Sequence, residues 1–276
     1  MEIKIAFSPC PNDTFIFDAM VNKKIDTEGI DFIYQMADVE QLNNYSFKQI
    51  FDVCKVSFHA YLHIIDSYIL LNSGSALGND VGPLLISKNK IEPVKLQEIT
   101  VAIPGKYTTA NLLLSIIYPR ITNKIEVIFS EIEDKILNNE VDAGVIIHEN
   151  RFTYQNKGLK LIADLGNKWK ELTNQPIPLG GIVVKRNLPT EIILKINKIM
   201  KKSVEYALNN PNSSKEFVRC NAQEMSEDVM KKHIQLYVND YTVDLGYNGK
   251  NAVKKLFQIA VEKGLINEFP QKALFL

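Results

Sequence analysis

Short runs of apolar, often β-branched residues alternate along this chain with stretches whose apolar residues recur every three or four positions. The first pattern is typical of buried strands and the second of amphipathic helices. Their alternation indicates an α/β fold with a mainly parallel sheet covered by helices. In the first part of the chain, the pattern predicts strands at 3–8, 31–36, 53–57, 68–71 and 82–87, and helices at 14–21, 39–45 and 58–65.

A second, similar series begins near residue 99, and from residue 189 onward the pattern is helical only. Two α/β lobes with a cleft between them are the simplest architecture, with lobe 1 formed by 1–95 plus 190–276 and lobe 2 by 96–189. The helical tail is expected to pack on lobe 1. The later elements are predicted as strands at 99–103, 124–129, 143–147, 159–164 and 181–185, and helices at 108–118, 132–138, 190–208, 214–221, 227–239 and 248–263.

Composition narrows the class of protein. The 276 residues carry 32 Lys and Arg against 32 Asp and Glu, and this balance gives no basic surface for nucleic acid or an anionic membrane. No apolar run approaches the roughly 18 residues that span a bilayer, and the N-terminus does not resemble a signal peptide. Three widely spaced cysteines do not indicate a disulfide framework or a structural zinc site. We expect a cytoplasmic protein that acts on a small molecule, and the sequence predicts no oligomeric state.

His148 is the first candidate for chemistry. It follows the apolar run at 141–147 and opens the polar stretch HENRF, residues 148–152. In open α/β sheets, ligands bind beyond the carboxyl ends of the strands. Imidazole is also the side chain whose ordinary pKa suits proton transfer near neutral pH. The pattern favours His148 as a catalytic base, and the alternative is a histidine that only caps a loop.

The segment SPCPNDTF, residues 8–15, follows the first predicted strand and opens the first predicted helix. Its two prolines make the loop rigid, and Asn12, Asp13 or Thr14 is expected to cap the helix. A rigid loop that leads to helix amides suits an anionic group. The alternative is a well-capped turn without a ligand. Cys10 is disfavoured as a nucleophile because no histidine lies nearby in the sequence.

A segment of the same form, IPGKYTTA at 103–110, opens lobe 2. Gly105 allows close approach of a ligand to the backbone, and Thr108 or Thr109 is expected to cap the following helix. Such a loop suits a carboxylate or phosphate, although the spacing is not that of a Walker A loop. An ordinary capped helix is the alternative. Ser57, at the end of the strand at 53–57, is a further candidate for hydrogen bonding to a ligand.

The remaining motifs do not predict a cofactor or a metal. His59 and His63 are four residues apart, but the glutamate of the zinc-peptidase motif and a third ligand are lacking. The glycine-rich stretch 72–83 lacks the G-x-G-x-x-G spacing of dinucleotide-binding loops. His233 lies within a predicted tail helix and is interpreted as a surface or packing residue.

Six segments, taken in order over residues 1–186, resemble the 1,4-dihydroxy-6-naphthoate synthase family of menaquinone biosynthesis. They are SPCPNDTF (8–15), KVSFHA (55–60), GNDVGPLL (78–85), IPGKYTTA (103–110), DAGVIIHENRF (142–152) and PIPLGG (176–181). The resemblance implies the two-lobed fold of type II periplasmic binding proteins. It also implies a lyase that converts cyclic dehypoxanthine futalosine into 1,4-dihydroxy-6-naphthoate without a metal or organic cofactor.

The resemblance also assigns roles to residues. It implies that His148 is the general base that starts elimination and aromatisation, and that Ser57, Thr108 and Thr109 contact the substrate. Asn12, Asp13 and Thr14 fall on residues of the family's cleft. Two other functions fit the same fold: a non-catalytic solute-binding protein and the sister enzyme chorismate dehydratase. The lack of a signal peptide argues against the first, and the SPCPND opening fits the naphthoate synthase better than the second.

Overall fold

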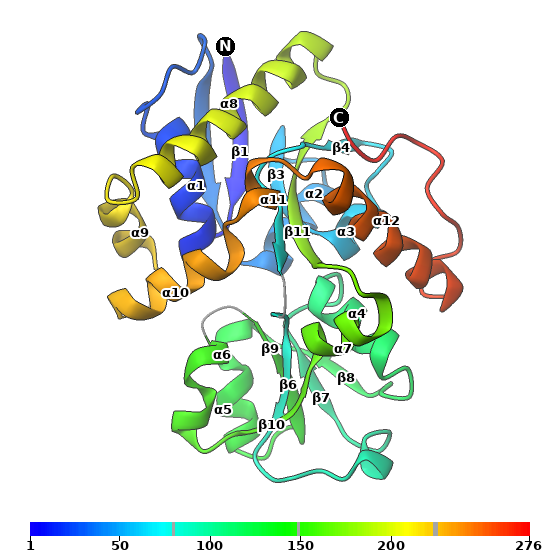
Figure 1. The fold of residues 1–276 in the computed structure, drawn as a ribbon. Coiled ribbons are helices and arrows are strands. Elements are labelled where there is room, and N and C mark those ends of the chain that lie inside the picture. Colours follow the sequence, from blue (N-terminus) through cyan, green and yellow to red (C-terminus); the bar gives the residue numbers. More distant parts are fainter. Residues whose placement is uncertain (79–80, 148–149, 223–225) are drawn as a thin grey trace. The chain divides into compact units, whose positions relative to one another are not determined.

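The computed structural model describes residues 1–78, 81–147, 150–222 and 226–276 (Figure 1). The chain forms two compact units: unit 1 contains 1–77, 180–251 and 270–276, and unit 2 contains 78–179 and 252–269. The positions of the parts relative to one another are not determined. The predicted interlobe cleft therefore stays a prediction.

The boundaries between the units fall earlier along the chain than the predicted positions near 95 and 189. Strand β6 (Leu84–Ser87), which the sequence placed in lobe 1, is hydrogen-bonded to strands of unit 2. Strand β11 (Ile177–Lys185) joins the sheet of unit 1 from Gly180 onward. The hydrophobic pattern predicts both strands but does not show which sheet each one enters.

Unit 1 contains a mixed sheet whose described strands run in the order β2-β1-β3-β11-β4, with β5 paired to β11. Strand β1 is parallel to β2 and β3, whereas β11 is antiparallel to β3 and β4. The sheet is thus less parallel than the sequence predicted, because β11 returns to it from unit 2 in the opposite direction. The other strands are β1 (Glu2–Phe7), β2 (Asp31–Met36), β3 (Val53–Ser57), β4 (Tyr68–Leu70) and β5 (Ala76–Gly78).

Helices cover this sheet, and the tail helices α8, α9 and α10 pack on α1 (Figure 1). The bounds are α1 (Pro11–Val21), α2 (Val39–Phe47), α3 (Phe58–Leu62), α8 (Thr190–Asn209), α9 (Lys215–Asn221), α10 (Glu227–Tyr237) and α11 (Asp240–Val243). The last tail helix, α12 (Gly246–Glu262), belongs to unit 1 up to residue 251 and to unit 2 from residue 252, so the tail does not lie in unit 1 alone as the sequence predicted. Helix α2 packs on β3, where the Cys54 thiol is directed at the Leu42 carbonyl.

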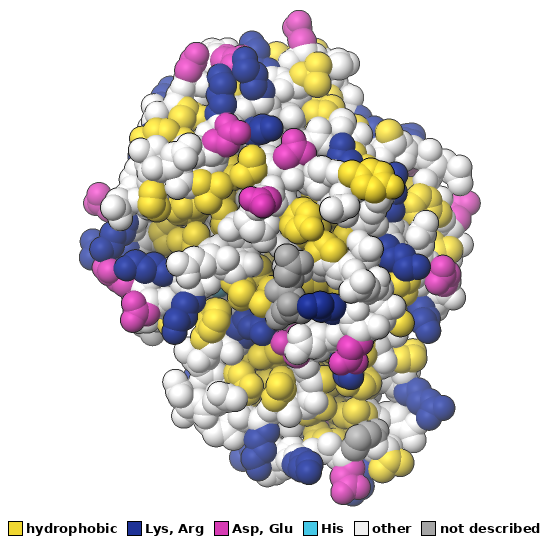
Figure 2. Space-filling model, viewed as in Figure 1, with side chains coloured by type: hydrophobic (Ala, Val, Ile, Leu, Met, Phe, Trp, Pro, Cys, Tyr) yellow, Lys and Arg dark blue, Asp and Glu magenta, His cyan; other side chains and the backbone are white. Residues whose placement is uncertain are grey.

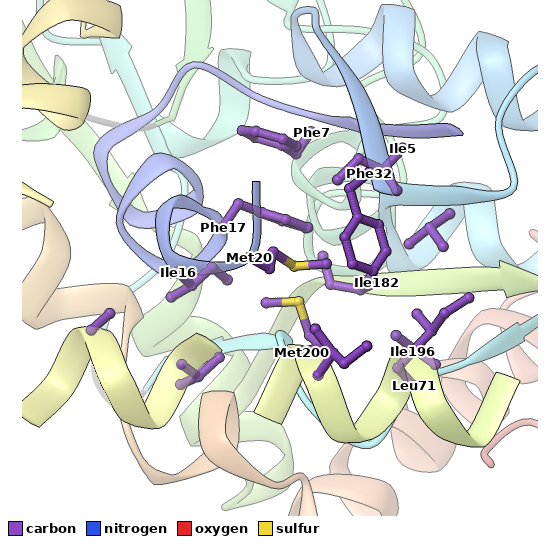
Figure 3. Close-up of a cluster of buried hydrophobic side chains, with 14 of the residues drawn as sticks. Ile5, Phe7, Ile16, Phe17, Met20, Phe32, Leu71, Ile182, Ile196 and Met200 are labelled. Carbon is purple, nitrogen blue, oxygen red and sulfur yellow. The ribbon is translucent and has the colours of Figure 1, made fainter. Parts of the chain in front are cut away.

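The core of unit 1 lies between β1, α1 and α8 (Figure 3). Alternate residues of β1, including Ile5 and Phe7, point into it, as the period of a strand requires. The Phe7 ring stacks on Phe17 of α1 with ring centroids 4.2 Å apart, and Met200 of α8 is also buried there. Burying one such side chain contributes about 1.5–3 kcal/mol, so this cluster holds α1 and its preceding loop on the sheet.

Unit 2 contains a second mixed sheet with the described strand order β10-β6-β9-β7-β8. Its middle strand β9 is buried along its whole length, and Gly144 within it allows α5 to pack closely. A Cβ atom at Gly144 would lie 2.4 Å from Cγ2 of Ile132. The bounds are β7 (Val101–Ile103), β8 (Lys124–Glu126), β9 (Ala143–Ile146), β10 (Lys160–Asp164), α4 (Thr109–Ile117), α5 (Ile132–Leu137), α6 (Asn150–Thr153), α7 (Leu165–Thr173), η1 (Pro93–Lys95), η2 (Phe129–Glu131) and η3 (Tyr154–Lys157).

The surface carries charges of both signs. Figure 2 shows Lys and Arg side chains interspersed with Asp and Glu on the face in view. This agrees with the zero net charge of the sequence. Within the described ranges, no helix is both long and apolar enough to cross a membrane.

Candidate functional site

The loop 8–10 enters α1 through a proline. Helix α1 begins at Pro11 with Cys10 in the N-cap position, and no side chain caps it. Proline suits the first helical position because its fixed φ is helical and its missing N–H would have no partner there. The prediction that Asn12, Asp13 or Thr14 caps the helix is therefore wrong, since these residues lie inside its first turn. The Thr14 hydroxyl instead donates to the Cys10 and Pro11 carbonyls at 3.1 and 3.3 Å.

Asp13 is the centre of a buried polar network. Its side chain is 2% exposed, and both carboxylate oxygens accept hydrogen bonds. Ser8 donates to Oδ2 from its hydroxyl at 2.7 Å and from its backbone N–H at 3.3 Å. Oδ1 accepts from Asn12 Nδ2 at 2.9 Å and from Lys55 Nζ at 2.5 Å. Four donors thus hold this carboxylate in one place and fix the loop that precedes α1.

Lys55 is a charged residue within the buried strand β3. It shares a sheet face with Val53, two residues earlier, and that face is directed at α1. The ammonium group of Lys55 therefore reaches the first turn of α1, where it forms an ion pair with Asp13. A buried charge without such a partner would be costly, so each side chain accounts for the burial of the other.

Asn12 extends this network to the tail of the chain. Its Nδ2 donates to Asp13, and its Oδ1 lies 2.8 Å from Nε2 of His233 in α10. His233 is completely buried. The sequence interpretation as a surface or packing residue missed this contact. The helical spacing of Met230, His233 and Tyr237 could have indicated a buried face, but not the partner.

Ser57 stands at the junction of β3 and α3, as the sequence predicted for a strand end. Its backbone N–H donates to Oδ1 of Asn43 at 3.0 Å, and Nδ2 of Asn43 donates to the Ser57 hydroxyl at 3.4 Å. Asn43 is itself held by Glu40, which accepts from Nδ2 at 2.8 Å. Ser57 is 4% exposed, and its position is set by these contacts from α2.

The loop 104–108 of unit 2 leads into α4, and Thr108 is the N-cap, which confirms one of the two predicted caps. The Thr108 hydroxyl accepts from the Asn111 N–H at 3.3 Å and donates to the carbonyl of Gly105 at 2.8 Å. Gly105 has a φ of 144°, a backbone conformation that favours glycine. Thr109, the first residue of α4, donates its hydroxyl to the Leu179 carbonyl at 2.6 Å.

A half-buried lysine supports this second loop. Lys124 of β8 donates to Oδ1 of Asn111 at 3.0 Å and to the Ser115 hydroxyl at 2.6 Å. The Nδ2 of Asn111 donates to the carbonyl of Lys106 at 2.7 Å. Burial lowers the pKa of Lys124 from its ordinary value. Asn111 thus links the loop at 104–108 to a basic side chain from β8.

His148 lies outside the described residues. On one side of it in the sequence, β9 ends at Ile146, and on the other, α6 begins at Asn150. Arg151 of the same motif donates to the Gly82 carbonyl at 2.5 Å and pairs with Asp164 at 3.1 Å. Asp164 also caps α7. The arginine of this motif thus ties the start of α6 to the end of β10.

The first turn of α1 contains Asn12, Asp13 and Thr14. Within it, Asp13 contacts Lys55 of β3, and Asn12 contacts His233 of α10. The structure does not show Ser57 bonded to that network within the described contacts. His59 and His63 have ring centroids 5.5 Å apart, and no group of three or more His, Cys, Asp or Glu side chains suited to a metal occurs among the described residues.

The model of a family described as menaquinone biosynthesis matches residues 3–262 of this chain. The chain belongs to this family. The resemblance that the six sequence segments indicated is thereby confirmed at the level of the family.

Two curated relatives are both named 1,4-dihydroxy-6-naphthoate synthase. A 1,4-dihydroxy-6-naphthoate synthase from Thermus thermophilus is 39% identical over 98% of this chain and 97% of its own length. One from Streptomyces coelicolor is 37% identical over 99% of this chain and 97% of its own length. The family member described here is thus similar to both along almost its whole length.

Solved structures agree on the fold. A crystal structure of a protein from Archaeoglobus fulgidus matches with a TM-score of 0.91 and 35% identity, over 96% of this chain and 98% of that one. A Candida albicans protein with the generic periplasmic binding protein fold matches with a TM-score of 0.70 and 12% identity, over 97% of this chain and 92% of that one. The predicted α/β class with a periplasmic-binding-protein-like fold is therefore confirmed.

Proposed function

We propose that this protein is a carbon–carbon lyase that converts cyclic dehypoxanthine futalosine into 1,4-dihydroxy-6-naphthoate during menaquinone biosynthesis. One observation carries the proposal: two relatives with that synthase name match 98 and 99% of the chain at 39 and 37% identity. The cytoplasmic location predicted from the sequence is part of the proposal, because the relatives are named as biosynthetic enzymes.

In this proposal, His148 is the general base. It follows the central strand of the second sheet in the sequence, and Arg151 of the same motif is anchored to Gly82 and Asp164. Removal of a substrate proton by His148 starts the elimination of the sugar-derived part. Formation of the aromatic ring drives the reaction, so one well-placed base with hydrogen bonds to the developing negative charge is sufficient chemistry.

Thr108 and Thr109 are proposed to bind the substrate through the N-terminal end of α4. A helix N-terminus favours a carboxylate, and the naphthoate group carries one. The loop is held in place before substrate arrives, because Thr108 is bonded to Gly105 and Asn111, and Asn111 to Lys124. A loop fixed in advance loses little entropy when it binds a ligand.

Ser57, Asn12 and Asp13 of unit 1 are proposed as site residues. Asp13 is enclosed by four donors, so its role is to fix the loop at 8–10 and the first turn of α1 rather than to bind substrate directly. The ion pair with Lys55 balances the negative charge of the Asp13 carboxylate. Thr14 serves the same purpose through its bonds to the Cys10 and Pro11 carbonyls.

The test is an assay of the purified protein with cyclic dehypoxanthine futalosine, in which 1,4-dihydroxy-6-naphthoate is detected by absorbance and mass. The proposal expects this product, and a parallel incubation with chorismate is expected to give no dehydration product. Binding of the futalosine compound without turnover would indicate a binding protein instead. Dehydration of chorismate would indicate the sister enzyme, and either result would overturn the proposal.

A further inference from the structure

We propose that His233 is a positioning residue for the first turn of α1, which it fixes by holding the side-chain amide of Asn12 in one orientation. This inference rests on the proposed function, because it takes the first turn of α1 as part of the substrate site. His233 belongs to α10 and Asn12 to α1, and they are 221 positions apart in the sequence. Their hydrogen bond joins the tail to the first turn of α1.

The chemistry of the network determines which way the Asn12 amide faces. The Asp13 carboxylate, paired with Lys55, accepts hydrogen bonds and does not donate them. The NH2 group of Asn12 must therefore face Asp13, at 2.9 Å, and its oxygen must face His233. A carbonyl oxygen only accepts, so Nε2 of His233 carries the proton in this contact, at 2.8 Å.

This assignment makes the imidazole of His233 the hydrogen-bond donor to the amide oxygen of Asn12. Without it, the Asn12 oxygen, in a residue only 8% exposed, would lose its buried partner. Rotating the amide to recover a bond would place its oxygen against the Asp13 carboxylate, which is repulsive. Nε2 donates in both the neutral Nε2–H form and the charged form of the ring, so the contact survives a change in the protonation of His233.

The surroundings of His233 indicate that packing alone does not account for it. Its neighbours on the buried face of α10 are Met230 and Tyr237, and the ring of Tyr237 lies 4.8 Å from the imidazole between centroids. An apolar side chain would fill such a position without the desolvation cost of an imidazole. The polar ring at this point is explained by the Asn12 oxygen that it contacts.

Two substitutions separate the hydrogen bond from the volume of the ring. His233→Phe keeps a planar ring and removes the donor, whereas His233→Gln places an amide N–H near the position of Nε2. We expect His233→Phe to lower kcat/KM for cyclic dehypoxanthine futalosine by about tenfold, the order of effect of an unpaired buried acceptor. We expect His233→Gln to stay within about threefold of wild type.

Met230→Ala is the matched control, because it removes a buried side chain from the same helix and leaves the imidazole of His233 in place. It should lower the thermal midpoint and leave kcat/KM unchanged. The proposal is overturned if His233→Phe retains wild-type kcat/KM, or if His233→Gln loses as much as His233→Phe does. An equal loss in Met230→Ala would also overturn it, by showing that the effect comes from the packing of α10.

A second readout does not depend on turnover. The chain has only four histidines, so ¹⁵N-histidine labelling gives a simple spectrum, and His233→Gln identifies the signals that belong to His233. We expect Nε2 of His233 to be protonated, with a shift in its resonance in Asn12→Leu. An unprotonated Nε2 would overturn the proposal. If wild type forms no product, the proposed function fails, while this spectrum still decides whether His233 holds Asn12.

Discussion

Removing the carboxylate of Asp13 is expected to destabilise the protein strongly. The variant Asp13→Ala leaves the ammonium group of Lys55 buried without its ion-pair partner. It also removes the acceptor for the donors of Ser8 and Asn12. The perturbation therefore affects a charge and several polar groups at once, all of them in the core that holds α1 on the sheet.

The structure sets the magnitude of the effect. Lys55 is 8% exposed and Asp13 is 2% exposed, so water screens this pair very little. Breaking a buried ion pair by removing one partner costs about 3–5 kcal/mol, since the remaining charge stays desolvated. Replacing both partners by neutral side chains costs much less. We expect Asp13→Asn combined with Lys55→Met to recover most of the stability that Asp13→Ala loses.

Urea unfolding followed by circular dichroism measures these differences as shifts of the midpoint. The exposed pair of Lys23 and Asp31, with side chains 68 and 54% exposed, provides the control. Asp31→Ala should change the midpoint only slightly, because solvent screens exposed ion pairs. If Asp13→Ala shifts the midpoint no more than Asp31→Ala does, the reasoning about the buried network is refuted.

Two further predictions concern the second loop and the acid stability of unit 1. Thr108→Ala should lower the free energy of unfolding by about 1 kcal/mol, because the N-cap of α4 is lost, whereas Thr108→Ser keeps the capping hydroxyl. Equal urea midpoints in the two variants would contradict this prediction. Hydrogen bonds from Lys198 and Lys202 lower the pKa of Glu28 from 4.5 to about 2. The stabilising effect of the ionised Glu28 is therefore present above pH 4.5 and is lost as the pH falls through 2. The thermal midpoints of wild type and Glu28→Gln should thus converge as the pH falls from 4.5 to 2. A difference between the two midpoints that stays constant over this range would refute the lowered pKa of Glu28.

Local patterns of apolar and polar residues predicted the bounds of some elements correctly. The strands predicted at 31–36 and 53–57 coincide with β2 and β3. Helix α1 begins at Pro11, three residues before the predicted start at 14, because Pro11 was predicted to belong to a rigid loop. Strand β11 begins at Ile177 rather than at 181, since Pro178 and two glycines interrupt the apolar pattern there.

The candidate site was predictable in its segments but not in its connections. The loop before Thr108 and the polar start of α1 were visible as short motifs with caps and prolines. The contact between Asn12 and His233 was not, because it joins residues 221 positions apart, and a histidine within a helix gives no local signal of its partner. The partner of Lys55 was not predictable for the same reason. One charge in an apolar strand indicates a buried ion pair, but only the packing of α1 near β3 shows that Asp13 is the partner.

The most direct test of the account compares wild type with His148→Asn, with cyclic dehypoxanthine futalosine as substrate. Turnover is measured as formation of 1,4-dihydroxy-6-naphthoate, and substrate affinity is measured separately by calorimetry. The account predicts product from wild type, and a loss of turnover of about a hundredfold or more in His148→Asn with little change in affinity, as expected when a general base is removed. Near-wild-type turnover in His148→Asn would contradict the role of His148 as the base.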